Sequence, residues 1–166
     1  MVISMPQAKA DKGNVSLKVE DVMVTEVVTI DENASVKEAA GIMNQFEIGS
    51  IIALRKGKAV GIITERDLLK RVIAESMDAE KTRVKDIMSS PLVVIAPGTE
   101  MEEAMRLMFE KKIKKLVVVD QKRLVGLVSL TDIARCQPAI IKLLKTFAAA
   151  QNTPKSMKKV LDYYIV

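Results

Sequence analysis

The sequence predicts a protein of the mixed α/β (α+β) class, built from two β-α-β-β-α repeats and followed by C-terminal helices. The first observation is an internal duplication, because 12 of the 49 positions in residues 19–67 are identical to the residue 65 positions later. The second is that short aliphatic runs and amphipathic segments follow one another in the same order in both copies. One copy is too small to bury both its strands and its helices, so we expect the two copies to pack against each other.

The duplication divides the 166 residues into five segments, with a short charged stretch between the two copies. The expected segments are a flexible N-terminal tail (1–18), the first repeat (19–76), a linker (77–83), the second repeat (84–136) and a C-terminal helical extension (137–166).

Three strands are expected in each copy. The first is a short aliphatic run, at 27–30 in one copy and 92–95 in the other. The second is a continuous apolar run typical of a buried strand, at 51–54 and 116–119. The turns RKGK and DQKR then lead into the third strands, VGII and VGLV, so each copy contains a hairpin.

Two helices are expected in each copy. A hydroxyl residue three positions before a glutamate predicts the start of the helix between the first two strands, Ser35 with Glu38 and Thr99 with Glu102. The last helix follows the third strand, over 65–76 and 130–136. Apolar residues at helical spacing mark the inner face of the first helix in each copy: Val36, Ala39, Ala40 and Met43, then Met101, Ala104, Met105 and Met108.

Composition disfavours several classes of function. The chain has no histidine, which removes the commonest general base and metal ligand, so we expect no enzyme and no required cofactor. The net charge of +5 comes from the two ends, because residues 19–136 hold 18 Lys and Arg against 19 Asp and Glu. Nucleic acid is therefore not favoured as a partner. No apolar run is long enough to span a membrane, and the single cysteine, Cys136, fits the reducing cytoplasm.

One seven-residue motif occurs twice: GIITERD at 61–67 and GLVSLTD at 126–132. A hydroxyl residue three positions before an aspartate, directly after a strand, matches a helix capping box. The same carboxylate also suits a ribose, because it can accept hydrogen bonds from two vicinal hydroxyl groups. The amide groups at the start of the helix suit an anion. Both interpretations, capping and ligand binding, remain open at this point.

Four features together resemble a tandem pair of CBS domains, the module named after cystathionine β-synthase. They are DVM and DIM at the starts of the copies, KKLVVVD at 114–120, and the seven-residue motif that occurs twice. The resemblance covers about residues 19–136 and is closest to stand-alone prokaryotic proteins. It implies a pseudo-twofold arrangement with two clefts between the repeats. It also implies a homodimer, and clefts that take adenosyl ligands.

The resemblance assigns roles to residues of the repeated pattern. The family's ribose-binding aspartate falls on Asp67 and Asp132, and its hydroxyl partner falls on Thr64 and Ser129. The position before the aspartate differs between the copies. It is Thr131 in the second copy and Arg66 in the first, where a guanidinium can contact phosphate through two hydrogen bonds.

The remaining expected contacts come from the first and second strands. The resemblance places the adenine near backbone of Val28 and Ile48, or of Val93 and Ile113. It places the basic phosphate contacts on Lys114 and Lys115, where the first copy has Gly49 and Ser50, so the two clefts are not equivalent. The alternative is that these lysines are a solvated helix end near the negative pole of its dipole.

The C-terminal extension carries two apolar stripes separated by Thr153 and Pro154. They would either cover the repeats or a sister subunit, or dock on a separate regulated protein. The expected function is an energy-sensing regulatory module that binds AMP, ADP or ATP. The alternative is an interaction module with vestigial clefts that acts through its C-terminal helices. A weaker alternative is an S-adenosylmethionine sensor or a nucleic-acid-associated regulator.

Overall fold

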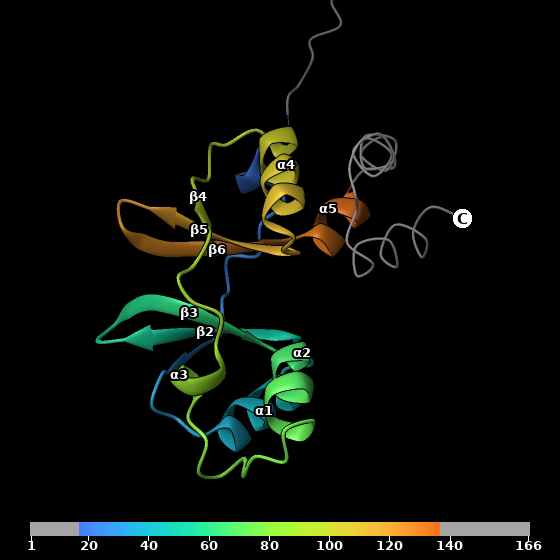
Figure 1. Ribbon diagram of the computed structural model, residues 1–166. Helices are drawn as coiled ribbons and strands as arrows, with labels where there is room; N and C mark the ends of the chain where they lie inside the picture. The colour runs from blue at the N-terminus through green and yellow to red at the C-terminus, as the bar shows by residue number, and fades with distance from the viewer. Residues whose placement is uncertain (1–16, 137–166) are drawn as a thin grey trace, which may run out of the picture.

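Two three-stranded sheets form the centre of the protein, one in each lobe (Figure 1). The structure is a computed structural model, and it describes residues 17–136. In each sheet the first two strands are parallel and the last two are antiparallel, which confirms the predicted mixed α/β class. The strands are β1 (Thr29–Asp31), β2 (Ser50–Arg55) and β3 (Lys58–Thr64), then β4 (Val94–Ile95), β5 (Lys115–Asp120) and β6 (Arg123–Ser129).

The helices follow the predicted order. The inner-face stripes are buried, apart from Ala40, which is half-buried. The predicted helix over 65–76 is shorter than expected, because one α-helical turn continues as a π-helix that ends at Ile73. The helices are η1 (Val19–Asp21), α1 (Val36–Gln45), α2 (Glu65–Leu68), the π-helix η2 (Leu69–Ile73), α3 (Val84–Ile87), α4 (Met101–Lys111) and α5 (Leu130–Cys136).

The helix starts show one correct and one wrong prediction. Ser35 is the N-cap of α1, and its hydroxyl accepts a hydrogen bond from the Glu38 amide at 3.1 Å. The predicted cap at Thr99 is wrong, because α4 begins one residue later, with Glu100 as N-cap. The first amide of α4 donates instead to the carbonyl of Leu17 at 2.8 Å. A distant segment of the chain therefore replaces the side-chain cap.

The starts of the two repeats are exchanged between the lobes. Val19 of η1 is fully buried among α4, β5 and β6, in the core of the second lobe. Val84 and Ile87 of α3 lie in the core of the first lobe. Figure 1 shows η1 beside α4 in one lobe and α3 below β2 and β3 in the other. The two lobes are thus held together by segments that each contributes to the other.

This exchange explains why the seven-residue motif begins with glycine in both copies. A Cβ atom on Gly61 would collide with the sulfur of Met88, and one on Gly126 would lie 2.6 Å from the sulfur of Met23. Each methionine comes from the other repeat's sequence and closes over the glycine of the lobe it enters. We call these two contacts the glycine–methionine contacts. A side chain at either position would force the methionine to shift, so both contacts favour glycine.

Two absences concern the described part of the chain. Between residues 17 and 136, no helix is long and apolar enough to cross a membrane. Over the same range, no group of three or more His, Cys, Asp or Glu residues is arranged to hold a metal ion. The C-terminal helices and the greater part of the N-terminal tail, predicted at 137–166 and 1–18, fall outside the described residues.

Candidate functional site

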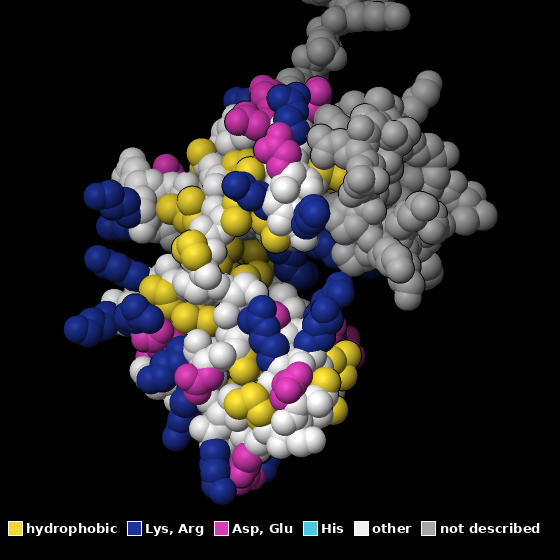
Figure 2. Space-filling model, in the orientation of Figure 1, with side chains coloured by type: hydrophobic (Ala, Val, Ile, Leu, Met, Phe, Trp, Pro, Cys, Tyr) yellow, Lys and Arg dark blue, Asp and Glu magenta, His cyan; other side chains and the backbone are white. Residues whose placement is uncertain are grey.

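Two cavities lie between the repeats, and each is lined by both of them. The first cleft has a volume of about 440 Å³, and the second cleft has a volume of about 380 Å³. In the space-filling view, a recess with apolar side chains separates the two lobes, and basic side chains lie beside it (Figure 2). The exchange of segments holds the lobes so that the start of the last helix in one repeat faces the start of the second strand in the other.

The structure brings every predicted site residue to one of these cavities. Gly49 and Lys115 line both of them, so these residues separate the two clefts. The others divide as follows: Thr64, Arg66, Asp67, Val93, Ile113 and Lys114 line the first cleft, and Val28, Ile48, Ser50, Ser129, Thr131 and Asp132 line the second.

The repeated hydroxyl and aspartate form a capping box at the start of each last helix. An Asp67 carboxylate oxygen accepts hydrogen bonds from the Thr64 amide at 2.9 Å and the Thr64 hydroxyl at 2.6 Å. The Thr64 hydroxyl accepts one from the Asp67 amide at 3.3 Å. Ser129 and Asp132 repeat the arrangement. The Ser129 amide donates to the Asp132 carboxylate at 3.2 Å, and the Asp132 amide donates to the Ser129 hydroxyl at 3.1 Å. The capping interpretation is therefore correct for both copies.

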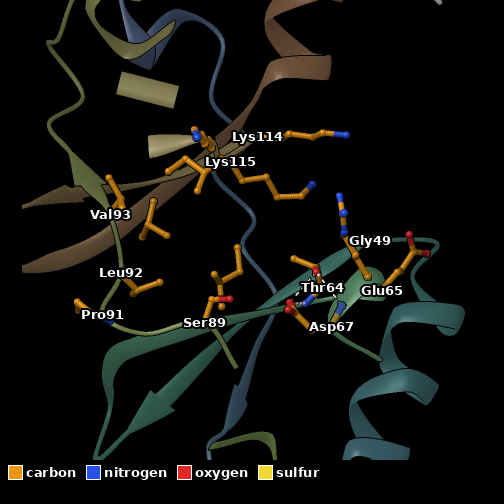
Figure 3. Close-up of a pocket in the computed structure, with 15 residues that line it drawn as sticks. Gly49, Thr64, Glu65, Asp67, Ser89, Pro91, Leu92, Val93, Lys114 and Lys115 are labelled. Atoms are coloured by element: carbon orange, nitrogen blue, oxygen red, sulfur yellow. Dashed lines mark hydrogen bonds between the residues drawn. The ribbon is translucent and has the colours of Figure 1, made fainter. Parts of the chain in front are cut away.

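Capping leaves part of the first carboxylate available. The second oxygen of Asp67 lies 3.6 Å from the Arg71 guanidinium, and the Asp67 side chain is 13% exposed. Figure 3 shows Thr64 and Asp67 on one side of the first cleft, with Lys115 extending toward them from the other repeat. The same residue can start its helix and present an oxygen to a ligand, so capping does not exclude binding.

The backbone expected to hold an adenine ring is already partly engaged. The Ile48 and Ile113 amides donate to Met43 and Met108 at the ends of α1 and α4, at 3.0 and 2.9 Å. The carbonyl of Val28 accepts from Ile52 at 3.1 Å. The amide groups of the two isoleucines already donate within the protein, so what they offer a ligand is the apolar surface of their side chains.

Charge differs strongly between the clefts. The first cleft is lined by four cationic side chains, Arg66, Lys112, Lys114 and Lys115, and by two carboxylates, Glu65 and Asp67. The second is lined by two cationic side chains, Lys115 and Arg135, and by three carboxylates, Glu26, Glu47 and Asp132.

Sequence reasoning missed Lys112 and Glu47, which occupy equivalent positions 65 residues apart. The available signal was that each directly precedes an isoleucine that was predicted.

The fold and the two clefts define a module of two repeats with a cavity on each side of their junction. The chain belongs to the CBS-domain family, whose sequence model matches residues 19–74 and 84–138. Pairs of these domains are regulatory, non-catalytic modules. A relative from Bacillus subtilis, CBS domain-containing protein YhcV, is 39% identical over 116 residues, which cover 70% of this chain and 82% of the relative.

Two solved structures illustrate what similar proteins do. The CBS domain pair of protein MJ0100, solved with 5′-methylthioadenosine and S-adenosylmethionine, has a TM-score of 0.66 and 29% identity. The match covers 72% of this chain and 94% of that one. The hexameric CBS-CP12 protein from bloom-forming cyanobacteria has a TM-score of 0.70 and 28% identity, covering 83% and 88% of the two chains.

Proposed function

We propose that this chain is a regulatory module that binds an adenine nucleotide, AMP, ADP or ATP, in the first cleft. The observation that carries the proposal is the composition of this one cavity. Asp67 of the first repeat lies across it from Lys114 and Lys115 of the second repeat. A carboxylate suits the two ribose hydroxyls, and cationic side chains suit phosphate. Apolar side chains of Ile62, Val93 and Ile113 line the same cavity and suit a purine ring.

A nucleotide in this cleft would contact both repeats at once. Ribose contacts would come from α2, and phosphate contacts would come from the start of β5. A ligand that prefers one arrangement of the lobes shifts the population toward it by its differential affinity. The bound state would then change the surface that the module presents to a separate regulated protein.

The test is a thermal-shift screen of the full chain, first shown to be free of bound nucleotide. The panel holds AMP, ADP, ATP, NAD, S-adenosylmethionine, 5′-methylthioadenosine and GTP. A ligand at 100 times its dissociation constant adds about 2.7 kcal/mol of stability. That corresponds to a rise of several degrees in the unfolding midpoint for a chain of this size. We expect adenine nucleotides to raise it and GTP to raise it less.

Matched variants assign the effect to a cleft. Asp67→Asn and Asp132→Asn each keep an oxygen that can accept the capping hydrogen bond, and each removes a carboxylate from one cleft only. Loss of the nucleotide shift in Asp67→Asn and its retention in Asp132→Asn would support the proposal. No shift with any adenosyl compound in nucleotide-free protein would contradict it.

Two alternatives have their own tests. S-adenosylmethionine is favoured by the MJ0100 structure, and it would give the largest shift in the panel. The interaction module with vestigial clefts predicts no nucleotide response at all. It also predicts that a partner captured by the full chain is lost when the chain is truncated after Cys136.

The oligomeric state is proposed to be a homodimer. Phe46, Leu69 and Ile73 expose 56, 63 and 69% of their surface on the helical side of the first lobe, which favours association. The hexameric CBS-CP12 protein provides the alternative. Light scattering of the eluted protein would distinguish a dimer from a hexamer by mass.

A further inference from the structure

The internal duplication allows the two clefts to be compared position by position. Glu47 directly follows the cap of α1, and Lys112 directly follows α4. Both adopt the left-handed conformation, with φ of 52° and 55°, and both are exposed. Each lines its own cleft, Glu47 the second and Lys112 the first. The backbone is therefore the same at these two positions, and only the sign of the charge is reversed.

Other equivalent positions change in the same direction. Where the first cleft has Pro91, the second has Glu26, and where the first has Arg66, the second has Thr131. Lys114 of the first cleft corresponds to Gly49. Two positions oppose the trend. Glu65 lines the first cleft where the second repeat has Leu130, and Arg135 lines the second cleft whereas the equivalent Lys70 lines neither.

The shared lysine increases the difference. Lys115 lines both clefts, so its ammonium group can serve only one ligand at a time. A phosphate held in the first cleft would draw Lys115 there, and the second cleft would keep Arg135 as its only other cationic lining residue among those described. A phosphate in the second cleft would then face Glu26, Glu47 and Asp132.

From this we infer that the second cleft is a separate site for an adenosyl ligand that carries no phosphate, and that Glu47 is a residue that excludes nucleotides from it. The inference rests on the proposed function, because the ribose contact is the one proposed for Asp67, made here by Asp132 with Ser129. Like charges at a cleft entrance repel, and exposed charges do so modestly, so the expected discrimination is on the order of tenfold per reversed charge.

The experiment titrates the full chain with two probes, adenosine and ADP, by calorimetry in buffer without divalent cations. The Asp67→Asn variant reports the second cleft, and the Asp132→Asn variant reports the first. In the Asp67→Asn protein we expect adenosine to bind and ADP to bind at least tenfold more weakly than it does at the first cleft. Adding Glu47→Lys should strengthen ADP binding at the second cleft about tenfold and change adenosine binding less than twofold.

Two further variants complete the design. Lys112→Glu in the Asp132→Asn protein should weaken ADP at the first cleft by a similar factor. Glu75→Lys changes the net charge by the same amount as Glu47→Lys at an exposed position that lines neither cleft, and it should leave both affinities unchanged. An equal effect of Glu75→Lys would mean that net charge alone is responsible, and it would overturn the inference.

The inference and the proposed function fail in different ways. If ADP binds both clefts with affinities within twofold, or if Glu47→Lys leaves ADP binding unchanged, the inference is overturned and the nucleotide-binding module stands. If neither adenosine nor ADP binds the unmodified protein, the proposed function fails and the inference falls with it.

Discussion

The two repeats share their scaffold and differ in their charges. Both have the same strand order, the same capping box after the third strand and the same glycine–methionine contact. The residues that line the clefts diverge, and Lys112 against Glu47 is the clearest example. The buried positions and the turns are fixed by packing, whereas side chains at the cleft entrances are free to change. A duplicated module can therefore keep one fold and hold two different sites.

The largest expected effect concerns the glycine–methionine contacts, which differ in one respect. Around Gly61, the three nearest atoms all belong to the Met88 side chain, whereas around Gly126 the backbone oxygen of Val24 also lies 3.1 Å from the position of an added Cβ. That oxygen accepts a hydrogen bond from Leu127 at 2.9 Å, so it cannot easily move. We expect Gly126→Ala to lower the free energy of unfolding by about 1–3 kcal/mol, and Gly61→Ala by less. Urea denaturation of both variants measures the difference.

Second-site changes sharpen this comparison. Met88→Ala should restore much of the stability lost in Gly61→Ala, because it removes all three close atoms. Met23→Ala should restore only part of the loss in Gly126→Ala, because the Val24 oxygen remains. Equal rescue in both lobes would show that the backbone contact is unimportant. No rescue in either would show that the methionine contacts do not require the glycines.

The next effect concerns Lys115, which belongs to both clefts. We expect Lys115→Ala to weaken ADP binding to the full chain about tenfold and adenosine binding less than twofold, because on the proposed binding mode the ammonium group would contact phosphate and no part of the nucleoside. Calorimetric titration measures both. Lys70→Ala, at an exposed position that lines neither cleft, is the control. Equal weakening of the two ligands by Lys115→Ala would rule out a phosphate role.

The sequence was sufficient to predict the order of the strands and helices and the fold class. The 65-residue correspondence located the repeated strands. This succeeded because periodicity and a repeated motif are local signals, and because two copies of one motif support each other. The predicted ligand contacts, among them Thr64 and Lys115, line the two clefts, but the sequence did not tell which residues share a cleft, and their role in binding stays a prediction.

The exchange of the first segments was not predictable in the same way. Val19 reads as the start of the first repeat, yet it packs in the core of the second lobe. Apolar residues of equivalent positions are interchangeable in a duplicated sequence, so the pattern cannot tell which copy each one contacts. The wrong cap at Thr99 has the same origin, because Leu17 supplies the acceptor from a distant part of the chain.

A smaller effect is expected when the hydroxyl of either capping box is removed. Thr64→Ala and Ser129→Ala should each lower the free energy of unfolding by about 1 kcal/mol, because each removes an acceptor for a helix amide. Ser35→Ala removes a cap that lies outside both clefts and should cost a similar amount. Urea denaturation without ligand measures all three. A loss at Thr64 or Ser129 far below that at Ser35 would mean that these hydroxyls contribute little to the fold.

The smallest expected effect is a pH dependence that belongs to the first lobe alone. Glu32 is nearly buried and forms two hydrogen bonds with the Arg55 guanidinium, at 2.5 and 2.8 Å, whereas the equivalent positions in the second repeat are Pro97 and Asp120. The bond from Arg55 holds the pKa of Glu32 below its usual value. Because the pKa of Glu32 is lower in the folded chain, its ionised carboxylate stabilises the fold fully above pH about 4.3, the pKa of a glutamate in the unfolded chain. That stability is lost as the pH falls through the pKa of Glu32 in the folded chain.

Urea denaturation between pH 3 and pH 7 tests this prediction for the wild-type chain, Glu32→Gln and Arg55→Gln. The unmodified chain should lose more stability on acidification than either variant. The slope of the free energy of unfolding against pH should fall by a similar amount in both variants, because each removes one half of the same ion pair. If Glu32→Gln reduces the slope and Arg55→Gln does not, the pKa of Glu32 depends on another cation. Lys85, whose charge also lowers the pKa of Glu32, would then be the residue to replace.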